Sequence, residues 1–222
     1  MTAVDATAET VPLSTAMREG SRAQHDDAES ASFISELMGG KLTEAAYVNY
    51  LSALAPVYEA LEETARSAAT DPLIARLFDA DLERHPSIVA DIEAWRTGAP
   101  EEDLYEGRAT RAYVDAIRAT ATNPVRLVAH LYTRYLGDLS GGLAIGRILD
   151  RDFSRNGSGL SFYEFASIAK PKVYKDDYRA ALDALPLDEG QRAEVVAEVQ
   201  AAFSHNQAVF AELGEHLDQF RR

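Results

Sequence analysis

The feature that most constrains this chain is a glycine-rich stretch inside a segment that otherwise predicts a helix. Tyr135 to Arg147 reads YLGDLSGGLAIGR and holds four glycines, while its leucines and isoleucines keep a helical pattern. Each interior glycine destabilises a helix by about 1 kcal/mol relative to alanine. Net stabilities are only about 5–15 kcal/mol, so we expect an interaction that offsets this loss.

The pattern alone leaves two explanations of these glycines open. Gly137 and Gly141 are four residues apart, so a neighbouring helix could approach closely at that face. Alternatively, the backbone itself approaches a flat ligand and gives the helix a point at which to bend. A phosphate-binding loop is a poor third explanation, because no strand precedes the glycines and the G-x-G-x-x-G spacing is missing.

The rest of the chain predicts an all-α, single-domain protein. No segment of useful length alternates with period two, and no linker divides the 222 residues. We expect a disordered N-terminal tail over 1–11 and one domain over 12–222. The expected helices run from Pro12 through His25, from Ser32 to Gly39, from Thr43 to Ala68, from Asp71, from His85 to a break at Thr97–Pro100, over 108–121, from Asn123 to Phe153, from Ser161 to Leu185 with an interruption at Pro171, and from Asp188 to Phe220.

Composition removes several classes of function. The formal net charge of −14 disfavours nucleic acid as a partner, because phosphate binding needs a basic face. The chain has no cysteine, which excludes disulfides, thiolate metal sites and cysteine nucleophiles. The longest uncharged stretch, Ala45 to Tyr58, is too short to span a bilayer, and the N-terminus does not look like a signal peptide. We therefore expect a soluble cytoplasmic protein without a membrane anchor.

Two histidines are candidates for a metal or cofactor site. His25 has Glu29 one helical turn later, an arrangement in which a carboxylate can orient a metal-bound imidazole. His130 stands seven residues before Gly137, so an α-helix would place it on the same face as the glycines. Spacing alone does not choose between them, and it favours an ordinary surface His–Glu pair for His25. No H-E-x-x-H motif is present.

Three blocks of sequence resemble the haem oxygenase family. The first is AQHDDAESASF (Ala23–Phe33), and the second, the most specific, is AHLYTRYLGDLSGG (Ala129–Gly142). The third is KVYKDDYRAALDAL (Lys172–Leu185), followed by AFSHNQAVFAEL (Ala202–Leu213). Together they follow the family from about residue 13 to 217. His205, next to Asn206, is a position that the resemblance does not interpret.

The resemblance implies a fold in which haem lies between a proximal N-terminal helix and a glycine-bent distal helix. His25 would be the axial iron ligand, with Glu29 as its partner, and His130 would not be the ligand. Asp138 would anchor a distal water network. The other implied site residues are Gly137, Gly141 and Gly142 on the distal side, Arg134, Tyr58 and Asn206 in the network, and Arg18, Tyr132, Lys175 and Arg179 at the haem propionates. Phe33, Phe203 and Phe210 are candidates to flank the macrocycle.

The implied activity is that of a soluble, bacterial-type haem oxygenase. Haem b would be both substrate and prosthetic group, cleaved with dioxygen and electrons from a reductase or ferredoxin to biliverdin, carbon monoxide and ferrous iron, with iron acquisition as the expected purpose. Residues 147–179 hold seven Lys and Arg against five Asp and Glu, so this segment is our candidate for docking the donor. We expect a monomer. The alternatives are a haem carrier or sensor without turnover, and a helical protein that binds no haem.

Overall fold

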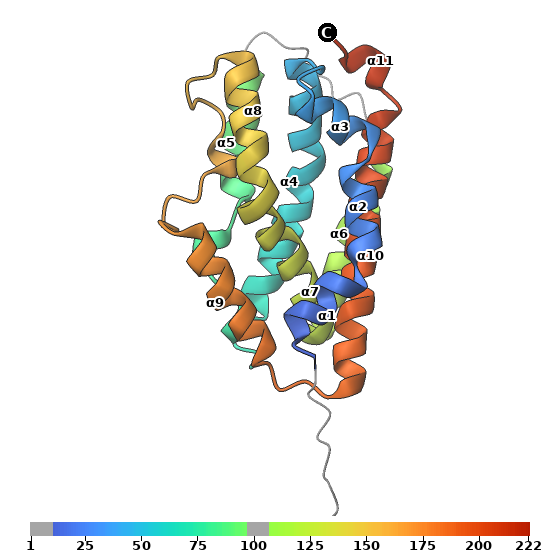
Figure 1. The fold of residues 1–222 in the computed structure, drawn as a ribbon, viewed down its shortest axis with the longest axis vertical. Coiled ribbons are helices and arrows are strands. Elements are labelled where there is room, and N and C mark those ends of the chain that lie inside the picture. The colour runs from blue at the N-terminus through green and yellow to red at the C-terminus, as the bar shows by residue number, and fades with distance from the viewer. Residues whose placement is uncertain (1–10, 97–106) are drawn as a thin grey trace, which may run out of the picture.

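The computed structural model describes residues 11–96 and 107–222, which form an elongated bundle of helices (Figure 1). These residues contain no β-strand, only an isolated bridge between Leu42 and Arg221, so the all-α prediction is confirmed. Within the same ranges no helix is both long and apolar enough to cross a membrane. The helices are α1 (Leu13–Gly20), α2 (Arg22–Glu29), α3 (Ser32–Met38), α4 (Glu44–Ser67), α5 (His85–Trp95), α6 (Arg108–Ala119), α7 (Pro124–Leu131), α8 (Leu143–Phe153), α9 (Pro171–Asp183), α10 (Glu189–Gly214) and α11 (Leu217–Phe220).

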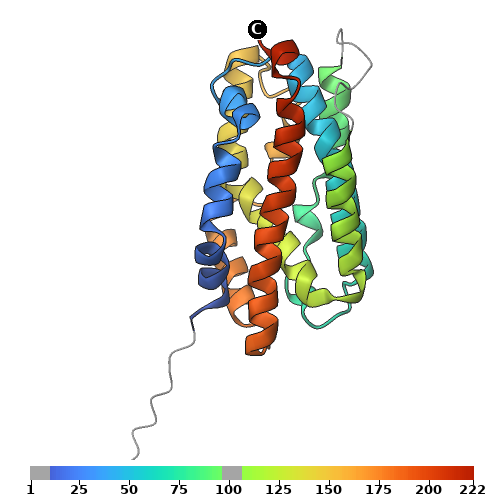
Figure 2. The same ribbon diagram turned by 90° about the vertical axis from the view of Figure 1, so that its right-hand side faces the viewer.

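Two long helices organise the bundle. α4 is buried along most of its length and packs against α5 and α6. α10 contacts α1, α2 and α3 on one side and α6 and α7 on the other, which Figure 2 shows with α10 between the N-terminal helices and α6. α7 and α8 belong to one distal helix that crosses α4 in Figure 1. The space between this distal helix and the α1–α2 pair therefore lies at the centre of the molecule.

Carboxylates from other helices cap several helix N-termini. α6 follows Gly107, whose φ of 71° is left-handed and which has no side chain to act as a cap. Glu212 of α10 replaces that cap, since its two carboxylate oxygens accept from the backbone N–H groups of Arg108 at 3.0 Å and Ala109 at 2.7 Å. The first N–H groups of a helix have no partner within it, and the helix dipole favours negative charge there.

Carboxylates also cap the starts of two other helical segments in the described chain. Glu62 of α4 accepts from Arg84 N and His85 N at the start of α5. Asp91 of α5 accepts from the backbone of Ser161 and Phe162, which begin a single 3₁₀ turn (η6, Ser161–Tyr163). Glu62, Asp91 and Glu212 are all buried. These acidic side chains are therefore part of the internal structure rather than of a solvated surface.

Several predicted helix boundaries are wrong. The helix predicted from Pro12 through His25 is divided into α1 and α2 at Ser21, whose hydroxyl donates to Met17 O at 2.8 Å. The helix predicted from Asp71 is a turn followed by one 3₁₀ turn (η1, Ile74–Arg76), because the Asp71 carboxylate accepts from nearby backbone N–H groups.

Two later boundaries also differ from the prediction. α9 begins only at Pro171, where a residue without an N–H suits the first helical turn, and Ser161 starts η6 instead. The last predicted helix ends at Gly214, and α11 follows it. Residues 1–10 of the predicted tail, and the predicted break at Thr97–Pro100, lie outside the described residues.

The distal helix contains two π-helical segments where one α-helix was predicted. They are η4 (Tyr132–Leu136) and η5 (Asp138–Gly142), placed between α7 and α8. A π-turn bonds residue i to i+5, so it changes the register of side chains on either side of it. The prediction that His130 shares a face with Gly137 is wrong for this reason: Gly137 lines the central cavity, whereas His130 is fully buried against Glu198.

We expect Glu212→Ala to lower the free energy of unfolding by about 1.5–3 kcal/mol, because it leaves two backbone donors of α6 without their charged acceptor. Glu215→Ala is the control, since Glu215 is exposed and only 3.4 Å from the Arg108 guanidinium. It should cost less than about 0.5 kcal/mol. Urea unfolding measures both values, and equal effects would contradict the capping role of Glu212.

Candidate haem site

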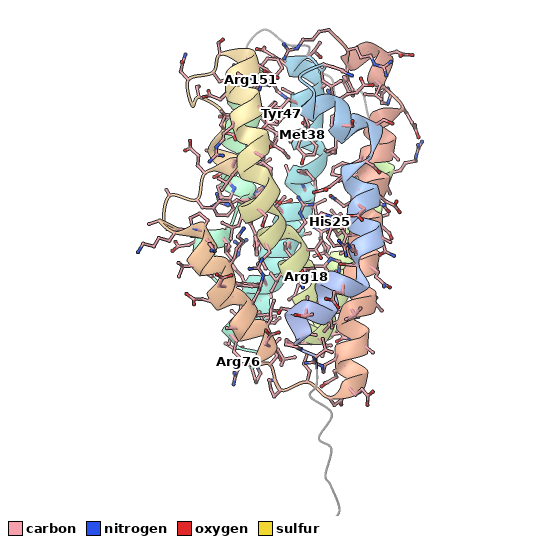
Figure 3. The ribbon with its side chains drawn as sticks, in the orientation of Figure 1. Arg18, His25, Met38, Tyr47, Arg76 and Arg151 are labelled. Carbon is pink, nitrogen blue, oxygen red and sulfur yellow. The ribbon has the colours of Figure 1, made fainter. Side chains whose placement is uncertain are left out.

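A cavity of about 320 Å³ opens between α2 and the distal helix. Figure 3 shows Arg18 of α1 and His25 of α2 on this side of the bundle, facing the distal helix. Residues from α1, α2, α3, α4, the distal helix, η6, α9 and α10 line it: Arg18, His25, Ala28, Glu29, Ile34, Tyr50, Tyr132, Thr133, Arg134, Leu136, Gly137, Asp138, Ser140, Gly141, Gly142, Ile145, Phe162, Tyr163, Arg179, Phe203, Asn206 and Phe210.

His25 forms the wall on the α2 side. It is the one histidine among the described residues that lines the cavity, and its side chain is 49% exposed. The ring meets Phe203 edge to face at 5.5 Å between centroids, which limits how the imidazole can turn. His25 Nε2 lies 3.6 Å from a Glu29 carboxylate oxygen, and Nδ1 lies 3.6 Å from an Asp26 carboxylate oxygen; both distances are beyond hydrogen-bond length.

The four glycines of the distal helix divide into two pairs. A Cβ added to Gly137 or Gly141 would meet no atom within 4 Å, so these two leave open space beside the backbone. A Cβ on Gly142 or Gly146 would lie 3.1 Å or 3.0 Å from the Tyr163 side chain. Close packing therefore occurs at Gly142 and Gly146, against η6, and not at the expected pair Gly137 and Gly141, which leave open space at the cavity. Gly142 lines the cavity, but its missing side chain makes room for Tyr163 rather than for a ligand.

A buried polar network is built around Asp138, which follows Gly137 in the distal helix. The Tyr58 hydroxyl donates a short hydrogen bond to the Asp138 carboxylate. Arg134 donates to the Tyr58 hydroxyl at 2.7 and 3.1 Å and to Asn206 Oδ1 at 2.8 Å. A second Asp138 oxygen lies 3.8 Å from the Arg134 guanidinium. The structure thus brings together the four residues of the expected network, from α4, the distal helix and α10.

Burial dominates the electrostatics of this network. It raises the pKa of Asp138 above that of an ordinary aspartate, although the Arg134 charge and the Tyr58 hydrogen bond act in the opposite direction. Burial also raises the pKa of Tyr58 well above the ordinary value. Tyr58 therefore remains a donor at neutral pH, and Asp138 holds a proton more readily than an exposed aspartate would.

Cations gather at the mouth of the cavity. Arg18 is 71% exposed, and Arg179 pairs with Asp176 at 2.9 Å. Tyr132 lies between them: burial raises the pKa of its hydroxyl, while the charges of Arg179 and Arg18 lower it. Arg18, Tyr132 and Arg179 line the cavity, as expected. Lys175 does not line it, because its Nζ donates to Ser140 Oγ on the distal helix at 2.9 Å.

Sequence reasoning missed much of the apolar wall. Phe33, a candidate for this wall, packs instead against Tyr50 and Phe220 outside the cavity, whereas Phe203 and Phe210 do line it. Tyr163 comes from a segment that was predicted to be helical and carries no local signal of its contact with the glycines. The other unpredicted lining residues are Ala28, Ile34, Tyr50, Thr133, Leu136, Ser140, Ile145 and Phe162.

The sequence model of the family described as heme oxygenase matches residues 11–212 of this chain. The chain belongs to the haem oxygenase family. Heme oxygenase 1 of Synechocystis is 34% identical over 93% of this chain and 87% of its own length. The chain is therefore an enzyme, an oxygenase that cleaves haem, and this favours cleavage over the carrier and haem-free alternatives.

Solved structures of haem oxygenases agree with this one. The enzyme from Leptospira interrogans superposes with a TM-score of 0.85 at 35% identity, covering 90% of this chain and 99% of that one. Haem oxygenase-1 from Synechocystis, solved in complex with heme, gives a TM-score of 0.84 at 34% identity, covering 94% of this haem oxygenase and 95% of that chain. The predicted haem oxygenase fold is confirmed.

The two pairs of glycines predict opposite effects of alanine. Gly146→Ala should lower the free energy of unfolding of the haem-free protein by about 1–3 kcal/mol, because its Cβ would overpack Tyr163. Gly141→Ala should leave it unchanged or raise it by up to about 1 kcal/mol, since alanine favours helix and meets open space. Hemin titration should show the reverse order, with the larger loss of affinity in Gly141→Ala. Equal stabilities of the two variants would refute this division of the glycines.

Proposed function

We propose that this haem oxygenase binds haem in the central cavity with His25 as the axial iron ligand. The observation that carries the proposal is that His25, alone among the histidines of the described chain, lines the same cavity as the open backbone of Gly137 and Gly141. Phe203 limits the rotation of its ring. The Glu29 and Asp26 carboxylates each lie 3.6 Å from one ring nitrogen, so either could orient the imidazole while the opposite nitrogen binds iron.

The residues present fit a flat ligand with two carboxylates. Aromatic and aliphatic side chains provide ten of the 22 lining residues, and the open glycine backbone lets a planar ring approach without a steric clash. We assign Arg18, Tyr132 and Arg179 at the mouth to the propionates, because guanidinium groups bind carboxylates through charge-assisted hydrogen bonds. Lys175 would join them by exchanging its hydrogen bond to Ser140 for one to a carboxylate.

Asp138 is the group that we propose supplies a proton on the distal side. Haem, when bound, contributes the iron that takes up dioxygen and the macrocycle that is oxidised. The raised pKa of Asp138 suits a residue that must hold and release a proton. We propose that the proton passes from the Asp138 carboxyl group to the bound dioxygen through ordered water. Tyr58, Arg134 and Asn206 fix the position of that carboxylate.

Other parts of the expected function remain predictions. They are electron supply by a reductase or ferredoxin, docking of that donor at residues 147–179, iron acquisition as the purpose, a cytoplasmic location and a monomeric state. Hemin titration followed by single turnover with an added reductant, with analysis of the biliverdin isomer, tests the proposed function. Binding without an open-chain product would contradict it.

His25→Ala should bind hemin with a shifted Soret band and should not form biliverdin until free imidazole is added, because the exogenous ligand replaces the missing side chain. Optical spectra with and without imidazole measure this. His216→Ala is the control, since His216 does not line the cavity, and it should behave as the parent protein does. A native spectrum for His25→Ala would mean that another residue binds iron.

Asp138→Ala should retain hemin binding but lose ring opening by about 10²–10⁴-fold, the typical contribution of a general acid, and should gain peroxidase activity. Biliverdin yield per turnover and oxidation of a phenolic substrate with peroxide are the two measurements. Asp115→Ala, at an exposed position of α6, is the control. An unchanged biliverdin yield for Asp138→Ala would eliminate its role in proton supply.

A further inference from the structure

The end of the cavity away from its cationic mouth is lined by tyrosines. We call Tyr47 and Tyr50 of α4 and Tyr163 of η6 the tyrosine cluster. Figure 3 labels Arg18, His25 and Tyr47 in succession along the bundle, with Tyr47 farthest from Arg18. Tyr50 and Tyr163 line the cavity, and the Tyr47 ring packs on both, at 6.2 Å and 6.4 Å between centroids. The roles proposed above for the cations and the Asp138 network leave this cluster unused.

The hydroxyl groups of the cluster have no protein partner. Those of Tyr47 and Tyr163 are enclosed and make no hydrogen bond within the described residues. Tyr50 is only 4% exposed, and its hydroxyl also makes no hydrogen bond in this part of the chain. Unlike the other two, the Tyr50 oxygen is not fully enclosed, so its accessible part lies at the cavity. Because buried hydroxyl groups are normally paired, this one indicates a ligand that supplies the partner.

Aromatic contacts fix the position of the Tyr50 hydroxyl. Its ring lies 6.0 Å from the Phe33 ring and 6.1 Å from the Phe210 ring, in addition to the contact with Tyr47. Three neighbours from α3, α4 and α10 therefore restrict rotation of the side chain. A donor held in this way needs no reordering when a ligand arrives, which favours binding.

The charge state of the cluster indicates which ligand group it suits. Burial raises the pKa of Tyr50 to about 12, with the Arg134 charge opposing this effect and the Asp138 charge adding to it. Tyr50 therefore keeps its proton at neutral pH and is a neutral donor. Among the described lining residues, the arginines are Arg18 and Arg179 at the mouth and Arg134, which is bound to Tyr58 and Asn206. A neutral carbonyl oxygen suits this end better than a carboxylate, which would need a cation of its own.

We propose that Tyr50 hydrogen-bonds a carbonyl substituent on the haem edge opposite the propionates, and that this enzyme prefers haems carrying such a group. The inference rests on the proposed placement of the propionates at the mouth. Haem b has vinyl groups on that opposite edge, and these offer no oxygen acceptor. A site that presents a buried donor discriminates against a ligand that leaves the donor unpaired. Tyr50 is thus a specificity-determining residue, while iron ligation and the propionate contacts still bind haem b.

The test compares two hemins that differ only at the vinyl positions. Diacetyldeuterohemin carries acetyl groups there, and mesohemin carries ethyl groups of similar size without an oxygen. Competition titrations should give a ratio of affinities that favours the acetyl compound about tenfold more in the parent than in Tyr50→Phe. Acetyl groups also alter the iron, but this effect is common to both proteins and cancels in the comparison.

Resonance Raman spectra give a readout that does not depend on affinity. A hydrogen bond weakens the carbonyl bond, so the acetyl C=O stretch should lie at lower frequency in the parent than in Tyr50→Phe. Tyr178→Phe is the matched control. Tyr178 is also buried with an unpartnered hydroxyl among the described residues, but it does not line the cavity. This variant should keep the parent ratio of affinities and the parent C=O frequency.

The outcomes separate this inference from the proposed function. If neither hemin gives a spectrum that changes in His25→Ala, the proposed function fails and the inference fails with it. If both hemins bind through His25 but Tyr50→Phe keeps the parent affinity ratio and C=O frequency, only the role of Tyr50 is refuted, as it would be if its hydroxyl binds ordered water. A changed ratio with an unchanged C=O frequency would also refute it, since that result indicates a steric effect.

Discussion

The structure around the cavity depends on one buried carboxylate. An aspartate enclosed as Asp138 is would be strongly unfavourable without partners, because burial penalises its charge. Tyr58 supplies a donor from α4, and Arg134 supplies a positive charge from the preceding turn of the distal helix. Arg134 then needs its own acceptors and finds Asn206 on α10. Satisfying one side chain in this way fixes three helices relative to one another.

The same arrangement explains why the site belongs to the core of the bundle. A change at Tyr58 or Arg134 alters both the surroundings of the Asp138 carboxylate and the packing of α4 against the distal helix. On the side formed by Gly137 and Gly141, by contrast, no side chain of the described residues contacts the positions of the missing Cβ atoms. The cavity thus has a hydrogen-bonded polar network on one side and open glycine backbone beside it, an arrangement that suits a large planar substrate.

The sequence predicted the fold class and which side chains meet in or beside the cavity, among them His25 and the members of the Asp138 network, because those depend on residue identity within blocks that the family shares. It did not predict the register of the distal helix, since a periodicity of 3.6 residues assumes an unbroken α-helix and the two π segments violate it. It also missed Tyr163, whose role arises only when η6 folds against Gly142 and Gly146. Contacts between distant segments leave no local trace in the sequence.

The positions of the charged side chains in this protein matter more than the net charge of the chain. The formal charge is −14, yet Glu62, Asp91 and Glu212 are buried at helix N-termini, where the macrodipole stabilises them. Glu198 likewise accepts from the Arg126 guanidinium and lies 2.9 Å from His130 Nε2. The mouth of the cavity, in contrast, is lined by Arg18 and Arg179. An acidic protein can therefore place positive side chains at one local part of its surface.

The π segments have a consequence for how this family can diversify. Each π segment depends on the number of residues in the distal helix, because a π turn contains more residues than an α-helical turn does. Losing a single residue between Tyr132 and Gly142 would rotate all of α8 about its axis by roughly 100° and carry Gly146 away from Tyr163. Insertions and deletions in this stretch should accordingly be far rarer during evolution than exchanges of side chains, and a relative with a different length there would need a differently built distal wall.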